Sequence, residues 1–552
     1  MYESGKLVRG CVLILAATII ALVLRVPRLG HRPMHGDEAV HAIKFGKLLE
    51  EGVYTYDPNE YHGPTLNYLT LIPAWLTGAA RLTQVTEFTL RVVPVFFGVC
   101  LILLLLPVVR ALGTGAAVYA ALLTAISPAM VFYSRYYIQE MLLVCFTFGA
   151  IVSGWRYVQS KASGWALLAA VFLGLMHATK ETCIIAFGSM VLALLLTLLM
   201  RRSKGSFIAA VKAVRPSHLV GGVVAAVIVS ALFHSSFLSN PGGILDSVRT
   251  YASYLGRASG SSLHLHPWHY YLQMLIYFRY GDGPIWTEAL IVMLAAVGFI
   301  AAMMGKGLSS ANVQLVRFMA FYTLLLTVAY SAIPYKTPWC MLGFLHGMIL
   351  LAGVGAVALV KLAPNVLPRL LILCLLFEAS VHLTWQAYRA NYEYDSDSRN
   401  PYVYAHPTTE VFTVVQRVEE MAGALKALAL EQPQTVQMRI QVICPGHDYW
   451  PLPWYFRRLE EGAVIWSDRV DASMDAAPLI IASPDVEGAL TEKLYTLTPL
   501  EKRQMYLFLF DKPYYVWLRP QVKLLGFVRR DLWEYFQQRQ AGAARTQTKG
   551  EK

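Results

Sequence analysis

Two adjacent carboxylates in a histidine-containing motif are the first residues in the sequence that could do chemistry. Asp37 and Glu38 stand in the text His35-Gly36-Asp37-Glu38-Ala39-Val40-His41, shortly after the first long apolar stretch. A carboxylate in such a place can act as a general base and take the proton of an attacking hydroxyl group. The same pair would also suit the start of a helix, where Asp37 could simply be the N-cap. The motif therefore predicts a general base or a helix N-terminus.

The segment that follows combines acidic and aromatic residues. Six of the 14 acidic residues in residues 1–387 fall between Asp37 and Glu60, and residues 54–64 read Tyr-Thr-Tyr-Asp-Pro-Asn-Glu-Tyr-His-Gly-Pro. This polar, aromatic loop is typical of a surface that contacts carbohydrate or phosphate, with His62 as a candidate ligand. The alternative is an aromatic belt at the membrane interface, where tyrosine is enriched.

Two further short motifs place charges beside apolar stretches. Glu140 begins a long apolar run after Phe132-Tyr133-Ser134-Arg135-Tyr136-Tyr137, and an ionisable group there is expensive unless it is paired or hydrated. Thr179-Lys180-Glu181-Thr182 forms a short turn between two apolar runs. Lys180 could bind a lipid phosphate. The duller alternatives are local ion pairs, Glu140 with Arg135 and Lys180 with Glu181.

The later loops and the tail offer weaker candidates. Arg257 lies in a loop at 239–283 that also holds His264, His266 and His269, and Lys336 lies in the turn Ile333-Pro334-Tyr335-Lys336-Thr337-Pro338. The histidines lack an adjacent carboxylate or cysteine, so we expect no metal site, although a divalent metal is left open. The run at 444–455 is rich in aromatic residues and predicts an acceptor-binding surface or a packed turn.

The overall composition is that of an integral membrane protein. The 552 residues are 56% hydrophobic and only 15% charged, whereas an ordinary soluble domain has roughly 25% charged residues. Residues 1–387 hold 27 Lys and Arg against 14 Asp and Glu, while residues 388–552 are nearly balanced at 20 and 21. The positive balance therefore belongs to the membrane part and argues against a nucleic-acid partner. The seven cysteines form no paired spacing that would predict disulfides or zinc.

Eleven apolar stretches are long enough to cross a bilayer. Their approximate windows are 10–26, 88–109, 115–132, 138–155, 164–180, 182–200, 218–238, 284–304, 314–333, 339–360 and 366–387. The short, aromatic, proline-containing stretch at 65–80 is interpreted as an interfacial helix, although its crossing the membrane is the open alternative. The basic residues of the short loops then gather on one side, which places the N-terminus in the cytoplasm.

This topology predicts the domain organisation and the location. Residues 1–387 form a polytopic α-helical transmembrane domain with external loops at 27–87 and 239–283. Residues 388–540 form an extracytoplasmic α/β domain, with strands at 438–444, 463–466 and 479–482 and helices near 456–461 and 525–538. Residues 541–552 are polar and are expected to be a disordered tail. We expect a multi-pass protein of the plasma (inner) membrane, because the first span resembles a retained anchor more than a signal peptide.

Residues 10–200 resemble the GT-C membrane glycosyltransferases. The resemblance rests on Asp37-Glu38 after the first span, on His62-Gly63-Pro64, and on Leu90-Arg91-Val92-Val93-Pro94 at the second span. Arg135 with Glu140, and the Thr179-Lys180 turn, continue it. These motifs are similar to those of the protein O-mannosyltransferases and of the ArnT-like enzymes (glycosyltransferase family 39-like), where His-Pro-Pro is common in place of His62-Gly63-Pro64. The text of residues 35–41 and 54–64 is closest to a prokaryotic subgroup described as flippase activity-associated.

The resemblance implies a reaction and a set of roles. These families take a sugar from a polyprenyl-phosphate donor without a metal or other cofactor, in a membrane-lipid environment. Asp37 would be the general base, with Glu38 its neighbour and Glu140 a second acidic site. Basic residues would bind the donor, and the candidates are His62, Arg91, Arg135, Lys180, Lys336 and Arg257. Single displacement would invert the anomeric centre. The acceptor could be lipid, glycan or protein, and the sequence predicts no oligomeric state. The alternatives are a flippase for lipid-linked sugars, or a flippase-associated assembly partner without transferase activity.

Overall fold

The computed structural model describes residues 2–59, 62–201, 214–258, 264–308, 310–432 and 437–550. The chain divides into two compact units. Unit 1 comprises Met1–Gly30 and Lys44–Tyr404, and unit 2 comprises His31–Ile43 and Ala405–Lys552. One boundary falls inside helix α2 (Gly36–Glu51), so the first turn of this helix belongs to unit 2. The candidate base Asp37 is thus described with unit 2.

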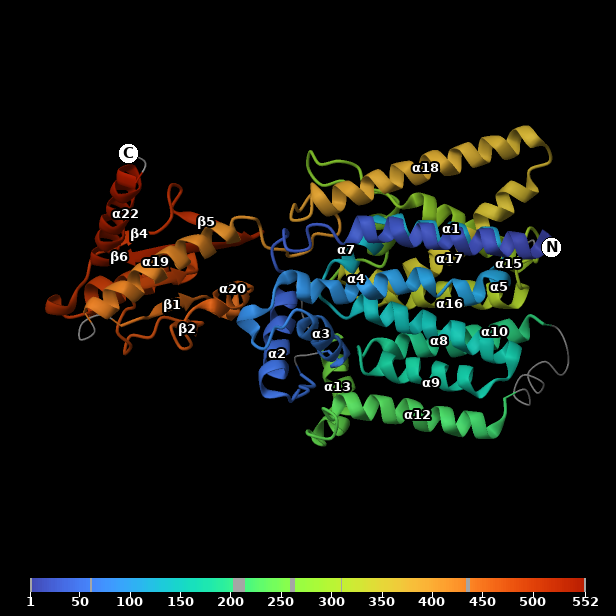
Figure 1. Cartoon of the computed structure of the whole chain (residues 1–552), viewed down its shortest axis with the longest axis horizontal. Coiled ribbons are helices and arrows are strands. Elements are labelled where there is room, and N and C mark those ends of the chain that lie inside the picture. Colours follow the sequence, from blue (N-terminus) through green and yellow to red (C-terminus); the bar gives the residue numbers. More distant parts are fainter. Residues whose placement is uncertain are drawn as a thin grey trace. The chain divides into compact units, whose positions relative to one another are not determined.

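Unit 1 is a bundle of long apolar helices that run alongside one another (Figure 1). Its helices are α1 (Tyr2–Arg25), α3 (Thr65–Leu76), α4 (Glu87–Leu103), α5 (Val109–Leu112), α6 (Thr114–Ile126), α7 (Pro128–Ser134), α8 (Glu140–Ser160), α9 (Ser163–His177), α10 (Cys183–Leu199), α12 (Pro216–His234), α13 (Gly242–Ala258), α14 (Tyr270–Ile276), α15 (Ala289–Met304), α16 (Val313–Ala332), α17 (Leu342–Leu362) and α18 (Val366–Tyr392). Many carry exposed leucine, valine and isoleucine side chains, as expected of surfaces that face lipid. The polytopic α-helical fold is confirmed.

The number of membrane crossings stays partly a prediction. Within the described residues, seven helical segments are long and apolar enough to cross a membrane, and the bent pair α6 and α7 makes an eighth. The helices α9, α10 and α15 are also apolar but shorter. The eleven predicted windows fall on these eight segments and three shorter helices. A count of eleven requires that all three shorter helices cross.

A proline explains the bend between α6 and α7. The two helices are inclined by 59° across the break at Ser127. Pro128 occupies the first position of α7, and a residue that precedes proline is pushed out of the helical region, as Ser127 is, with φ −59° and ψ 123°. The Ser127 side chain then caps α7 by accepting a hydrogen bond from the Met130 N–H.

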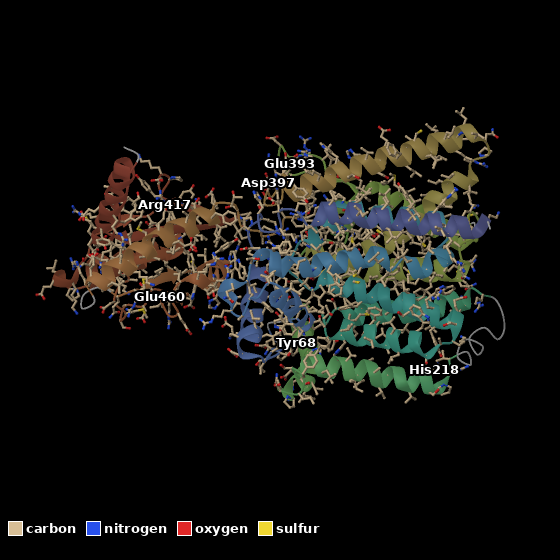
Figure 2. All side chains as sticks on the ribbon, in the orientation of Figure 1. Tyr68, His218, Glu393, Asp397, Arg417 and Glu460 are labelled. Carbon is tan, nitrogen blue, oxygen red and sulfur yellow. The ribbon has the colours of Figure 1, made fainter. Side chains whose placement is uncertain are left out.

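Short helices cover the end of the bundle opposite the N-terminus. Figure 1 shows α3 and α13 there, and in Figure 2 Tyr68 of α3 lies at this end while His218, at the start of α12, lies at the other. Helix α3 has only 12 residues, contains Pro73, and leaves Trp75 and Leu76 exposed. These features suit the interfacial helix that the sequence predicts, and α3 is not among the candidate spans.

Unit 2 is an α/β domain built on one mixed sheet. Its strands are β1 (Ile440–Ile443), β2 (Val464–Ser467), β3 (Leu479–Ala482), β4 (Tyr506–Phe508), β5 (Tyr515–Arg519) and β6 (Val522–Arg529). The helices are α19 (Val411–Glu431), α20 (Leu452–Tyr455), α21 (Glu487–Glu492) and α22 (Arg530–Gly550). The strand order is β2-β1-β3-β6-β4, with β1 parallel to β2 and β3, and β6 antiparallel to β3, β4 and β5. The three predicted strands lie on β1, β2 and β3.

Three details of unit 2 differ from the sequence-based expectations. The helix predicted near 456–461 is only a 3-10 turn at Phe456–Arg458. The helix predicted at 525–538 begins only at Arg530, because residues 522–529 pair with β3 as strand β6. Their run of apolar and β-branched residues favours a strand. Helix α22 also extends to Gly550, into the stretch expected to be a disordered tail, where Ala541, Ala543 and Ala544 are strong helix formers.

Candidate active site

The first turn of α2 gives its two carboxylates different tasks. His35 precedes the helix, and its carbonyl accepts the first helical hydrogen bond, from the Ala39 N–H at 3.0 Å. The Asp37 N–H donates to His35 Nδ1 at 3.0 Å, and the His35 N–H donates to Glu38 Oε2 at 3.0 Å. This reciprocal pattern is a variant of the capping box, in which the N-cap histidine accepts from the second helical N–H and Glu38 accepts from the N-cap N–H. The carboxylate of Asp37 therefore has no part in capping the helix.

Burial separates the two carboxylates further. The Glu38 side chain is 0% exposed, and its Oε1 lies 3.6 Å from Arg32 Nη2, itself only 5% exposed. The Asp37 side chain is 51% exposed, with Oδ2 3.9 Å from His35 Nδ1. A buried, paired carboxylate is held in place, whereas a half-exposed one can meet a reactant. The Glu38 carboxylate therefore stabilises the turn, and the Asp37 carboxylate is accessible at its surface.

In unit 1, Glu140 and Lys180 form a buried ion pair. Glu140 is the first residue of α8, and Lys180 lies in the turn between α9 and α10. Each side chain is only 6% exposed, and the Lys180 ammonium donates a hydrogen bond to Glu140 Oε1. The pair lines a pocket together with Thr182, Tyr330 and Trp339. Neither local pairing considered from the sequence, Glu140 with Arg135 or Lys180 with Glu181, is the one observed here.

The next residue, Glu181, faces the loop that precedes α3. Its Oε1 accepts from the Tyr56 hydroxyl at 3.0 Å, and its Oε2 lies 2.9 Å from His62 Nδ1. Burial alone would raise the pKa of Glu181, but the charge of His62 and its hydrogen bond lower the pKa to about 2. Burial and the charge of Glu181 raise the pKa of Tyr56, so its hydroxyl stays protonated and donates. His62, a candidate donor ligand, is therefore engaged with a carboxylate.

Gly63 explains why the chain departs from His-Pro-Pro at this point. A Cβ on Gly63 would collide with the carbonyl of Ala178. The Thr65 N–H donates to that carbonyl at 3.2 Å, and the Thr65 and Thr179 hydroxyls are 2.8 Å apart. The backbone of this loop thus packs directly against the turn between α9 and α10, and only glycine leaves the room for it.

Arg91 and Arg135 bind backbone carbonyls just beyond α1. Arg91 Nη1 donates to the Leu29 carbonyl at 2.6 Å, and Arg135 Nη1 donates to the Tyr392 hydroxyl at 2.8 Å and to the Arg25 carbonyl at 3.3 Å. Arg25 itself is fully buried and donates to the carbonyls at the end of α6. These guanidinium groups fix the chain where it leaves α1, and their proposed contact with phosphate stays a prediction.

The remaining donor candidates lie elsewhere in unit 1. Lys336 is buried and its ammonium donates to the carbonyls of His266 and Ile333, so it joins the segment before α14 to the turn after α16. The side chain of Arg257 lies outside the described residues. Among the side chains that the structure describes, no group of three or more His, Cys, Asp or Glu could hold a metal ion.

Sequence reasoning missed the buried carboxylate of Glu288. It accepts hydrogen bonds from the Ser127 hydroxyl at 2.5 Å, the Ala129 N–H at 2.9 Å and the Tyr402 hydroxyl at 2.8 Å. Glu288 therefore stabilises the start of α7, which leads to Arg135 and Glu140. The sequence shows Glu288 only as a single acidic residue at the edge of an apolar stretch, and this position alone does not predict its hydrogen-bond partners.

Comparisons with known proteins agree with this architecture. Residues 70–233 match the model of the dolichyl-phosphate-mannose-protein mannosyltransferase family. The structure is similar to the crystal structure of ArnT from Cupriavidus metallidurans bound to undecaprenyl phosphate, with a TM-score of 0.58, 15% identity, and coverage of 94% of this chain and 97% of ArnT. It is also similar to the oligosaccharyltransferase AglB from Archaeoglobus fulgidus in complex with an inhibitory peptide and a dolichol-phosphate, with a TM-score of 0.50, 12% identity, and coverage of 95% and 77%. No curated protein matches the chain significantly.

The likenesses to solved structures extend over nearly the whole chain, whereas the motifs in the sequence cover only residues 10–200. The family match spans α4 to α12 and includes Glu140, Lys180 and Glu181. The predicted resemblance to the GT-C glycosyltransferases of the ArnT and protein O-mannosyltransferase type is confirmed, and the chain has their fold.

Proposed function

We propose that this protein transfers a glycosyl group from a polyprenyl-phosphate-linked donor to an acceptor hydroxyl group on the extracytoplasmic face of the membrane. The observation that carries the proposal is the first turn of α2, where His35 and Glu38 complete the cap and leave the Asp37 carboxylate half-exposed. Undecaprenyl phosphate in the similar ArnT structure supports a lipid donor of this class.

In the proposed reaction Asp37 takes the proton of the acceptor hydroxyl. The acceptor oxygen forms a bond to C1 of the sugar as the bond from C1 to the phosphate oxygen breaks, and the polyprenyl phosphate leaves. A single displacement inverts the configuration at C1. A lipid monophosphate carries less charge than a nucleotide diphosphate, so protein cations can stabilise it without a metal.

The cations that could serve the departing phosphate are already paired within unit 1. Lys180 is bound to Glu140, and His62 is bound to Glu181. A phosphate could therefore be bound at this turn by exchanging one anionic partner for another, with the tyrosine-rich loop at 54–59 beside it. Arg91, Arg135, Lys336 and Arg257 stay secondary candidates for the donor.

The experiment that tests this proposal distinguishes transfer of the sugar from movement of the glycolipid across the membrane. Purified protein in proteoliposomes receives a labelled polyprenyl-phosphate sugar and a crude acceptor extract. The wild type should release polyprenyl phosphate and label the acceptor, and Asp37→Asn should abolish both. Glu51→Gln is the matched control, because Glu51 is an exposed carboxylate at the other end of α2. Movement of the glycolipid across the membrane without transfer by any variant would favour the flippase and overturn the proposal.

A further inference from the structure

One nitrogen of the His35 ring accepts a hydrogen bond from the backbone of the candidate base. His35 Nδ1 accepts the Asp37 N–H at 3.0 Å, so this nitrogen must carry a lone pair. The geometry therefore assigns the neutral imidazole with its proton on Nε2. An imidazole at the N-cap differs from the usual serine, threonine, aspartate or asparagine in one respect, because it can lose its acceptor by taking up a proton in the neutral pH range.

Three segments of unit 2 contribute groups near His35. On its own segment are Asp37, whose Oδ2 is 3.9 Å from Nδ1, and the buried pair of Glu38 with Arg32. The His406 ring lies against the His35 ring, with the centroids 4.7 Å apart and the ring planes inclined by 57°. Tyr455 of α20 accepts the Met34 N–H at 2.8 Å, which fixes the residue before His35.

A proton on His35 Nδ1 would change both interactions of Asp37. The imidazolium could no longer accept the Asp37 N–H, so the first turn of α2 would lose half of its capping box. The new positive charge would lie beside the Asp37 carboxylate and attract it. Since Glu38 is already paired with Arg32, the half-exposed Asp37 side chain is the carboxylate that is able to turn toward the ring.

We propose that His35 is a positioning residue and a proton switch for the base. The neutral ring presents the Asp37 carboxylate to the acceptor, and the protonated ring binds that carboxylate and makes it a poorer proton acceptor. This inference rests on the proposed function of Asp37. It deepens that function by naming what regulates the site: the acidity of the compartment that α2 faces.

The test is a pH profile of polyprenyl-phosphate release between about pH 5 and 8 by the wild type and by two variants of His35. The wild-type rate should decline as the pH falls. His35→Asn keeps a side-chain oxygen that can cap the helix but does not titrate, so its rate should lose most of this decline and stay within a few-fold of the wild-type rate at pH 8. His35→Ala should be slower at every pH. His406→Asn removes the neighbouring ring and should keep the decline.

A second measurement does not depend on activity. In protein labelled with ¹⁵N-histidine, the difference between the wild-type and His35→Asn spectra isolates the His35 signals. At pH 8 they should show an unprotonated Nδ1 and a protonated Nε2. A proton on Nδ1 at that pH, or a His35→Asn enzyme that keeps the full acid decline, would overturn the switch. If Asp37→Asn retains transfer, the proposed role of Asp37 as the base fails instead, whatever the spectra of His35 show.

Discussion

The first turn of α2 in unit 2 and the turn between α9 and α10 in unit 1 treat neighbouring charges in contrasting ways. In α2, the Glu38 carboxylate accepts the His35 N–H and lies beside Arg32, whereas the Asp37 carboxylate stays half-exposed. In the other turn, Lys180 and Glu181 are both buried, and each is bound by another side chain, Lys180 by Glu140 and Glu181 by His62. One turn leaves a carboxylate half-exposed, and the other buries its charged side chains against partners.

The difference shows that the contacts of an acidic residue indicate its role better than its position in a helix does. Asp37 and Glu140 both lie in the first turn of a helix, where a carboxylate suits the helix dipole. Only Asp37 combines that place with half-exposure and with a cap made by its neighbours. Glu140 instead balances a buried lysine, which suits phosphate exchange or structure better than proton transfer.

The largest effect on stability is expected from Lys180→Met. It leaves the buried Glu140 carboxylate without its cation, which should cost about 3–5 kcal/mol and lower the thermal unfolding temperature in detergent. The double variant Lys180→Met with Glu140→Met should recover most of the loss. Lys361→Met, at an exposed lysine in the last turn of α17, is the control. Equal unfolding temperatures for Lys180→Met and the control would show that the ion pair is not needed.

Glu38→Gln should separate stability from chemistry. The amide oxygen can still accept the His35 N–H, but the buried Arg32 loses its counter-ion, at an expected cost of about 1–3 kcal/mol. The folded fraction should nevertheless transfer sugar within a few-fold of the wild type. The measurement is a turnover rate per folded molecule, with folding followed by circular dichroism. An inactive but fully folded Glu38→Gln would reverse the assignment of the two carboxylates.

Gly63→Ala should destabilise the contact between the His62 loop and the Ala178 carbonyl. The added methyl group has no space, and such overpacking costs about 1–3 kcal/mol. Gly188→Ala in α10 is the matched control, because a Cβ there would meet nothing within 4 Å. The measurement is the thermal unfolding temperature of each variant. Equal unfolding temperatures for Gly63→Ala and Gly188→Ala would contradict the close contact.

Glu181→Gln should have an effect on stability that depends on pH. The pKa of Glu181, about 2, lies below its ordinary value of 4.5, so the carboxylate contributes its full stability above pH 4.5 and loses it as the pH falls toward 2. The gap in unfolding free energy between wild type and variant should be largest above pH 4.5 and should narrow as the pH falls from 4.5 toward 3. Glu51→Gln should show no such gap. A gap that is constant with pH would contradict the ion pair with His62.

Much of the fold follows from the sequence, because its signals are local. Apolar runs predicted the helices of the bundle, and three short β-rich runs predicted β1, β2 and β3. Strand β6 was missed for two reasons. Its pairing with β3 depends on a partner about 45 residues away in the sequence, and the residues that follow it have a helical pattern.

The candidate site shows the same limit at the level of side chains. The sequence identified Asp37, Glu140 and Lys180 as unusual, but it could not choose their partners. Glu140 pairs across 40 residues, and His62 pairs with Glu181 across 119. The cap on α2 was easier to predict, because His35 and Glu38 have capping-box spacing. It was missed because histidine is not a usual N-cap residue.

Chemical rescue tests the central claim most directly. Asp37→Ala removes the carboxylate, and its half-exposed position leaves room for a small one from solution. We predict that polyprenyl-phosphate release by Asp37→Ala is slower than that of the wild type by at least about 100-fold. It should rise with added sodium formate, while release by Glu38→Ala should not respond. Release by Asp37→Ala at the wild-type rate without formate would contradict the account, because another group would then be taking the proton.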